Sequence, residues 1–276
     1  MQQIPSLPFQ LKQYIWTYID GIFIEHFIRN STNTRKALET VRPTWKRLGT
    51  FLLETSAIYG YLDIIKYCHK NDFEWSVSIA EKAAKNGHLD IVKYCCENGL
   101  ESNDRVTLLA ATTNGKLDIV KWISPRVPID WITISLAAGF GHLDIVKWSR
   151  SIDTPWPWNE VTTLAAAHSG HLDILKWVRS TDPPCPWGED TFNKAAEMGH
   201  MDMVQYCHEN KCPWGVKTTK LAAENGHLDI IKWLRSRNPP CPWNGETVQY
   251  AVNRGHWDVV EYCHGNKCFG DSEILE

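Results

Sequence analysis

The stretch Gly226–Trp233, which reads Gly-His-Leu-Asp-Ile-Ile-Lys-Trp, decides the fold because it is repeated along the chain. Closely similar stretches begin at eight glycines: Gly60, Gly87, Gly115, Gly141, Gly170, Gly199, Gly226 and Gly255. Successive copies start 26 to 29 residues apart. A period of this length indicates an array of stacked units, each of which buries its apolar face against its neighbours.

The residues before each glycine predict a first helix in every unit. Four residues ahead of the glycine stands a small residue: Ser56, Ala83, Ala111, Ala137, Ala166, Ala195, Ala222 and Ala251. Small side chains in the middle of a helix allow another helix to approach closely. In the seventh unit we expect residues 218–225 to form this helix and Gly226 to end it, because glycine tolerates the left-handed conformation.

The residues after each glycine predict a second helix. In the seventh unit Leu228, Ile230, Ile231 and Leu234 have the spacing of one buried helical stripe. The seventh residue after the glycine is always Trp or Tyr, and we expect most of the 14 tryptophans to pack between units rather than to stack on bases or sugars. The third is always Asp, where a negative charge suits the first helical turn. We expect this Asp to pair with the Lys that usually follows three residues later.

An apolar–Pro–Trp stretch joins the later units, at residues 156–158, 185–187, 212–214 and 241–243. Proline does not fit inside a helix, so we expect an extended segment there. A turn-forming residue follows each Trp. The next helix is expected to begin near a threonine: Thr107, Thr133, Thr162, Thr191, Thr218 or Thr247.

This pattern resembles the ankyrin repeat. The two-alanine first helix, the opening Asn-Gly-His-Leu-Asp-Ile-Val-Lys at residues 86–93 and the turn between units carry the resemblance, which covers about residues 51–270. The Thr-Pro-Leu-His opening of the family is absent, and each unit is shorter than the usual length of about 33 residues. The Cys-Pro-Trp form looks like ankyrin proteins of large amoeba-infecting viruses and protists. The resemblance implies an all-α fold, an ankyrin-type helix-turn-helix solenoid of about eight short repeats over residues 51–276.

Residues 1–50 lack the repeat, and we expect them to form a helical N-terminal cap on the first unit. The pair Leu7-Pro8, an amphipathic helix ending near Asp20 and the stretch Val41–Leu48 are also similar to an F-box. That resemblance implies binding of a Skp-type adaptor through residues 7–48. From the sequence both interpretations stay open, a cap and a degenerate F-box.

Composition and charge favour a folded protein of the cytoplasm or nucleus, or of the host cytoplasm if the chain is viral. The chain is 43% hydrophobic and 22% charged, which is typical of folded rather than disordered proteins. Its net charge of −3 lacks the basic footprint of nucleic-acid binding. The apolar stretch Tyr14–Ile28 is short and interrupted by charges, and Met1–Pro5 does not open a secretory signal. The nine cysteines are an odd number. We therefore expect neither nucleic acid nor a membrane as partner.

Clustered cysteines and histidines allow either a zinc site or apolar packing. Cys207, His208 and Cys212 form one cluster, and residues 263–268 repeat it. Thiolates and imidazoles bind zinc. In other units, however, the position of Cys207 holds Ile, Ser, Val or Leu, and that of Cys212 holds Phe, Leu, Ile or Trp. Positions that accept such side chains favour buried packing, so we expect no metal.

The repeated His-x-Asp pair, for example His200 and Asp202, has the groups used in acid–base catalysis. The pair recurs six times at the same helix start, whereas catalysis needs one copy, so we expect turn and helix capping instead. The sequence has no P-loop, dinucleotide fingerprint or His-Glu-x-x-His stretch. We expect no enzyme, no catalytic residues and no cofactor.

Binding is expected where the units differ. The family resemblance implies that partners contact the turn tips and first helices. The polar candidates there are Asn159, Glu160, Glu189, Asp190, Lys194, Glu197, Lys217, Asn244 and Glu246. Because the tips are mostly acidic, we expect a protein partner with a basic or mixed surface. We expect the chain itself to be a monomer. The leading hypothesis is a non-enzymatic protein–protein interaction scaffold. The alternative is a substrate receptor of a cullin-type ubiquitin ligase.

Overall fold

The computed structural model describes residue 50 and residues 53–70, 73–100 and 102–268. Within these ranges every regular element is a helix and there is no strand, so the predicted all-α class is confirmed for this part of the chain. The predicted N-terminal cap and the F-box-like stretch at residues 7–48 lie outside the described residues.

Each unit contains a first and a second helix, as the repeat predicts. The first helices are residues 53–59, α4 (Ser78–Asn86), α6 (Asp104–Thr113), α8 (Trp131–Gly139), α10 (Glu160–Ser169), α12 (Glu189–Glu197), α14 (Val216–Glu224) and α16 (Gly245–Arg254). The second helices are α3 (Leu62–Lys70), α5 (Leu89–Glu97), α7 (Leu117–Ile123), α9 (Leu143–Ser151), α11 (Leu172–Ser180), α13 (Met201–Glu209), α15 (Leu228–Arg235) and α17 (Trp257–Gly265). A short 3-10 helix, η1 (Ser124–Arg126), follows α7.

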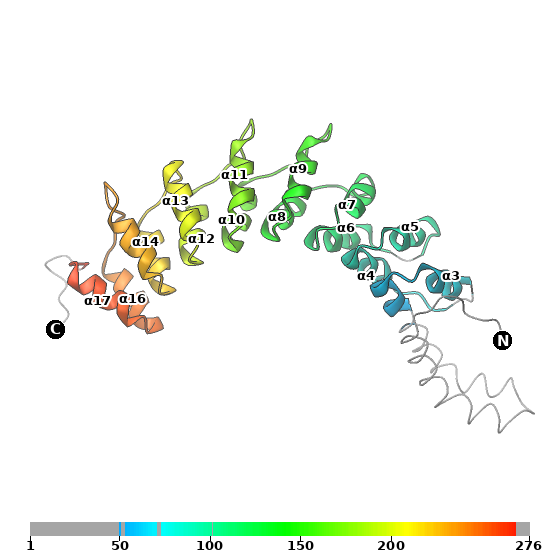
Figure 1. Cartoon of the computed structure of the whole chain (residues 1–276), viewed down its shortest axis with the longest axis horizontal. Helices are drawn as coiled ribbons and strands as arrows, with labels where there is room; N and C mark the ends of the chain where they lie inside the picture. Colours follow the sequence, from blue (N-terminus) through cyan, green and yellow to red (C-terminus); the bar gives the residue numbers. More distant parts are fainter. Residues whose placement is uncertain (1–49, 51–52, 71–72, 101, 269–276) are drawn as a thin grey trace, which may run out of the picture.

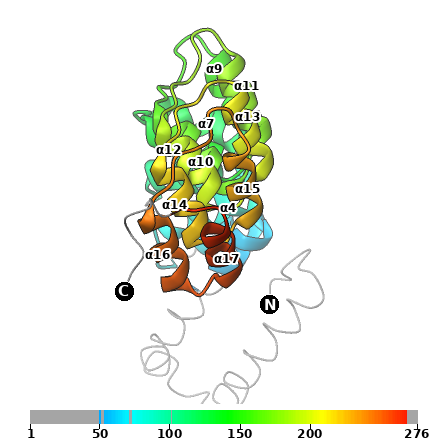
Figure 2. The same ribbon diagram turned by 90° about the vertical axis from the view of Figure 1, so that its left-hand side faces the viewer.

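The helix pairs form a curved row (Figure 1). Each first helix from α4 to α14 contacts the first helix of the next unit, and α3, α5, α7, α9 and α11 contact one another in the same order. Figure 2, which looks along the row, shows α10, α12, α14 and α16 on one side and α9, α11, α13, α15 and α17 on the other. The first helices line the inner side of the curve in Figure 1.

The repeated glycine makes the turn between the two helices. Gly226 has φ 75°, and the backbone N–H of His227 donates to the carbonyl of Ala222 at 2.9 Å. This left-handed turn satisfies a carbonyl that the end of α14 would otherwise leave unpaired. A Cβ atom at Gly226 would also lie 2.5 Å from Nδ1 of His256 in the following unit. Glycine is therefore required both for the turn and for the approach of the next unit.

The first helix of the seventh unit begins two residues earlier than predicted. Helix α14 starts at Val216, and the backbone N–H of Gly215 donates to Oγ1 of Thr218 at 3.1 Å. The threonine thus marks the first turn rather than the first residue. Its buried hydroxyl also donates to Oδ1 of Asn193 on α12 at 2.6 Å, so this position links neighbouring first helices.

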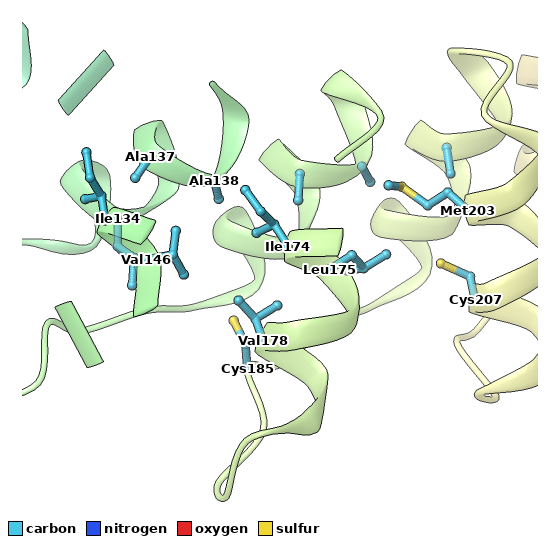
Figure 3. Close-up of a cluster of buried hydrophobic side chains, with 14 of the residues drawn as sticks. Ile134, Ala137, Ala138, Val146, Ile174, Leu175, Val178, Cys185, Met203 and Cys207 are labelled. Atoms are coloured by element: carbon cyan, nitrogen blue, oxygen red, sulfur yellow. The ribbon is translucent and has the colours of Figure 1, made fainter. Parts of the chain in front are cut away.

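The core runs continuously through the row, because the predicted small and apolar positions face each other. Paired alanines such as Ala137 and Ala138 are fully buried, as are the residues four, five and eight after most of the glycines, for example Ile174, Leu175 and Val178. Burying an aliphatic side chain of this size contributes about 1.5–3 kcal/mol. Figure 3 shows this packing for Ile134, Ala137, Ala138, Val146, Ile174, Leu175, Val178, Cys185, Met203 and Cys207.

The apolar–Pro–Trp stretches lie outside the helices and form no strand. In three of the four stretches an arginine, which was not predicted to have a role, holds this conformation. Arg179 donates to the carbonyl of Cys185 at 2.5 Å, and its guanidinium lies 4.2 Å from the ring centroid of Trp187. Arg150 and Arg235 repeat both contacts in their own units.

The expected pairing of Asp with Lys on each second helix is wrong. None of the ion pairs within the described residues joins these two positions. Three of the lysines instead lie over the tyrosine ring of the next unit, 5.5 to 5.8 Å from its centroid: Lys66 over Tyr94, Lys176 over Tyr206 and Lys232 over Tyr262. An exposed ion pair on a helix contributes only a few tenths of a kcal/mol, so a nearby ring competes with it.

Candidate functional site

The candidate residues lie on the first helices and at the turns that precede them. Two of the nine, Asn159 and Asn244, occupy the residues just before α10 and α16. Oδ1 of Asn159 accepts a hydrogen bond from the backbone N–H of Val161 at 3.0 Å, which caps α10. The backbone N–H of Asn244 donates to Oγ1 of Thr247 at 3.3 Å. Both asparagines therefore have a structural role at helix starts.

Five more candidates form ion pairs within the chain. Asp190 on α12 pairs with Lys217 on α14 at 2.8 Å, and Glu246 on α16 pairs with Lys220 on α14 at 2.5 Å. The hydrogen bond and charge of Lys217 lower the pKa of Asp190, and those of Lys220 lower the pKa of Glu246. Lys194 and Glu197 pair within α12 at 2.7 Å. The charges at this end of the row are thus largely matched between neighbouring groups.

Glu160 and Glu189 are the two acidic candidates that pair with no cation among the described residues. Both are exposed in the first turn of their helices. The carboxylate of Glu189 accepts one long hydrogen bond, 3.4 Å, from Nδ2 of Asn193. The structure therefore divides the predicted acidic tips into paired and unpaired carboxylates, a distinction that the sequence did not predict.

The clustered cysteines are packing residues, as their positions in other units predicted. Cys207, Cys212, Cys263 and Cys268 are buried, and so are the residues at the same positions elsewhere, such as Val178 and Trp156. The contact of Cys207 with Cys212 and its burial raise the pKa of the Cys207 thiol. No group of three or more potential ligands suited to a metal ion occurs within the described residues.

The cysteine before each Pro-Trp also has a specific contact. The thiol of Cys212 donates to the carbonyl of Gly188 in the preceding unit at 3.3 Å. Cys185 and Cys241 do the same toward Asn159 and Gly215, at 3.3 to 3.4 Å. Cys268 has the corresponding position in the last unit, without a following Pro-Trp, and donates to Asn244 at 3.2 Å. Burial raises the pKa of Cys185 to about 12 and that of Cys241 to about 11, so these thiols stay protonated and can donate.

The predicted capping role of the repeated histidine is wrong. The side chain of His227 makes no capping bond at the start of α15. Its Nε2–H instead donates to the carbonyl of Glu197 at the end of α12, at 2.9 Å. His88, His142 and His200 reach the preceding unit in the same way, at 2.9 to 3.3 Å. The Asp two residues later does lie in the first turn, as predicted, in each second helix such as α15.

A group of exposed apolar side chains on the first helices was not predicted from the sequence. Val106 on α6, Trp131 and Ile132 on α8, and Val161 on α10 are 38 to 40% exposed. Phe140, directly after α8, is 56% exposed. A comparison of units would have found them, because the positions of Trp131 and Ile132 hold Glu189 and Asp190 in another unit. An apolar residue at a position that accepts charge is not there for core packing.

Neither the models of known protein families nor the curated proteins contain a match to this sequence. Within the described residues no helix has the length and apolar character needed to cross a membrane.

Proposed function

We propose that this chain is a non-enzymatic protein–protein interaction scaffold built as an ankyrin-type helix-turn-helix solenoid of about eight short repeats. The glycine turn, the two-alanine first helix and the unit-by-unit helix contacts support the ankyrin-type interpretation. Partners are expected on the inner, first-helix side of the row, since extended concave surfaces are where such arrays bind.

One observation carries the proposal: the units keep small or apolar residues at most core positions and vary widely in charge and polarity where the first helices face solvent. The position of Ala137 is small in every unit, whereas the position of Trp131 holds Arg105, Glu160 and Gly245 in others. Folding of the repeat alone does not require an exposed tryptophan at the position of Trp131, because other units fold with a polar residue or glycine there. Function resides in the variable surface of a repeated frame.

The test is partner capture by two matched variants of the full chain. One reverses three first-turn acids on first helices, Glu160, Glu189 and Glu246, to Lys. The other reverses three first-turn acids on second helices, Asp144, Asp173 and Asp229, to Lys. Both change the net charge equally and carry the same kind of helix-dipole cost, about 0.3–1 kcal/mol per site.

We expect proteins captured from a eukaryotic cell extract by the wild-type chain to be lost with the first-helix variant and kept with the second-helix variant. Equal retention by both would refute binding through the first helices. A chain lacking residues 1–50, used in the same capture, separates the alternative function. Loss of cullin and adaptor subunits with that truncation would support a ligase substrate receptor, whereas their absence from every capture would contradict it.

A further inference from the structure

Three neighbouring first helices carry a continuous set of exposed apolar side chains, which we call the apolar patch: Val106, Trp131, Ile132 and Val161. These residues lie in the first turns of α6, α8 and α10. The three turns are adjacent, because α6 contacts α8 and α8 contacts α10. Nη2 of Arg105 on α6 donates to both carboxylate oxygens of Asp130 before α8, and Ser135 on α8 hydrogen-bonds Thr162 on α10 at 3.0 Å.

The apolar character of the patch is not a requirement of the repeat. In other units the position of Ile132 holds Ser78, Asp190, Lys217 or Glu246, all of which fold into the same first turn. Helix α8 has no charged residue between Trp131 and Gly139. Charge depletion around an exposed tryptophan is the composition of an interface centre rather than of an ordinary surface.

The patch is bordered by carboxylates that form no ion pair within the described residues. On its C-terminal side the next carboxylates along the row are those of Glu160 and Glu189. Neither forms an ion pair with a Lys or Arg among the described residues. Both carboxylates point toward a glycine of the following unit. A Cβ atom on Gly188 would lie 3.4 Å from Oε2 of Glu160, and one on Gly215 would lie 3.3 Å from Oε1 of Glu189. Both carboxylates thus lean along the row, away from the patch.

The first turn of α6, on the opposite side of the patch, holds one acid and one base. Asp104 is partly buried and accepts hydrogen bonds from Ser102 and Cys96, and Arg105 is held by Asp130 at 2.8 Å. A partner therefore meets an apolar centre with the exposed carboxylates of Glu160 and Glu189 on one side. This arrangement favours a bound segment that combines apolar side chains with Lys or Arg.

We propose that the apolar patch binds a segment of a protein partner that carries apolar side chains together with Lys or Arg. Trp131 provides the central contact, and the cations of the segment pair with Glu160 and Glu189. This inference rests on the proposed scaffold function and adds to it a position and a partner chemistry.

The first experiment selects binders from a random-peptide library on the immobilised full-length chain. The enriched peptides are expected to share an aromatic or aliphatic cluster with Lys or Arg on one side. Enrichment of acidic peptides, or of no sequence at all, would overturn the inference.

The second experiment measures the Kd of a selected peptide by fluorescence anisotropy against matched variants of the full chain. Trp131→Ser and Val161→Ser test the patch. Trp257→Ser and Val252→Ser are the controls, since Trp257 is 66% and Val252 37% exposed on the last unit. We expect Trp131→Ser to weaken binding about tenfold or more, as for a central interface tryptophan, and the controls to stay within about twofold. Equal effects of Trp131→Ser and Trp257→Ser would contradict the proposed position.

The third experiment tests the charges. The double variant Glu160→Lys, Glu189→Lys is compared with Glu261→Lys, an exposed acid on α17. We expect the Kd of the peptide to rise about tenfold for the double variant and to stay unchanged for Glu261→Lys. High salt should also raise the Kd for wild type, but by a smaller factor. A basic peptide that binds the double variant as tightly as wild type would refute the role of the carboxylates.

The remaining outcomes separate this inference from the scaffold function. If binding depends on Lys194 or Tyr250 of the later first helices but not on Trp131, the scaffold proposal stands and the patch inference fails. If wild type self-associates in sedimentation and Trp131→Ser abolishes it, the occupant is a second copy and the inference also fails. Binding that no first-helix substitution alters contradicts both proposals.

Discussion

Nε2 of His227 lies 2.9 Å from the carbonyl oxygen of Glu197, 30 residues earlier in the chain. The bond joins the start of one second helix to the end of the preceding unit's first helix, and the imidazole ring packs over the Gly199 turn, where a Cβ atom would meet its Cε1 at 2.6 Å. One side chain thus satisfies a carbonyl at a helix end and closes the contact between two units.

The first prediction concerns this histidine. We expect His227→Ala to lower the free energy of unfolding by about 1–3 kcal/mol, because a carbonyl loses its partner and a gap opens over the glycine turn. Urea denaturation followed by circular dichroism measures it. His168→Ala, at an exposed position of α10, is the matched control and should change stability by less than about 0.5 kcal/mol. Equal losses for the two variants would show that the contact between units contributes nothing.

The second prediction concerns the glycine turn. Gly226→Ala introduces both a strained positive φ and a contact with the His256 ring, so we expect a loss of about 1–3 kcal/mol. Gly265, at the end of α17, has open space around its Cα and no positive φ. There the same substitution should be neutral or stabilising by up to about 1 kcal/mol. Thermal unfolding of the two variants side by side checks the contrast, and a destabilised Gly265→Ala would contradict it.

The third prediction concerns the arginine that holds the Pro-Trp stretch. Arg179 both donates to the Cys185 carbonyl and stacks on Trp187, and a lysine lacks the planar group needed for both contacts. We therefore expect Arg179→Lys to destabilise the chain by about 1–2 kcal/mol in urea denaturation. Arg126→Lys is the control, because Arg126 is exposed and stacks on Trp122 but donates to no carbonyl of an apolar–Pro–Trp stretch within the described residues. A loss at Arg126 as large as at Arg179 would show that stacking alone matters.

The fourth prediction concerns alkaline pH. Burial raises the pKa of Cys95 and Cys185 to about 12 and that of Cys68 to about 11, from an ordinary value of 9.0. The folded chain holds these protons more tightly than the unfolded chain. Their contribution to stability is therefore complete below pH 9 and is lost as the pH rises from 9 toward the folded-state values. Each such thiol should cost about 1 kcal/mol between pH 8 and pH 10.

Urea denaturation at both pH values, with reductant present, measures this loss. Other groups also titrate in this range, so the comparison is with Cys185→Ala. That variant should be less stable at pH 8, because a buried thiol is replaced, but its stability should fall by about 1 kcal/mol less on going to pH 10. An unchanged pH dependence would mean that the Cys185 thiol ionises as readily in the folded chain as in the unfolded chain.

Most of what lies within one unit could be predicted from the sequence. The eight glycines determined where the first helices end, and the alanines and aliphatic residues around them determined which faces are buried. Comparing the units even assigned Cys207 and Cys212 to packing, because Val178 and Trp156 stand at the same positions. These inferences succeed because periodicity within a helix pair follows directly from helix geometry.

What lies between units was decided only by the tertiary structure. His227 was expected to cap its own helix and Lys232 to pair with Asp229, yet both side chains reach into a neighbouring unit. The sequence also did not predict which polar tips are paired within the chain: Asp190 and Glu246 pair with lysines one helix away. The physical reason is the same in each case. A repeat determines the environment of a position, but the distance between residues 25 to 30 apart in sequence depends on how one unit is rotated and stacked on the next.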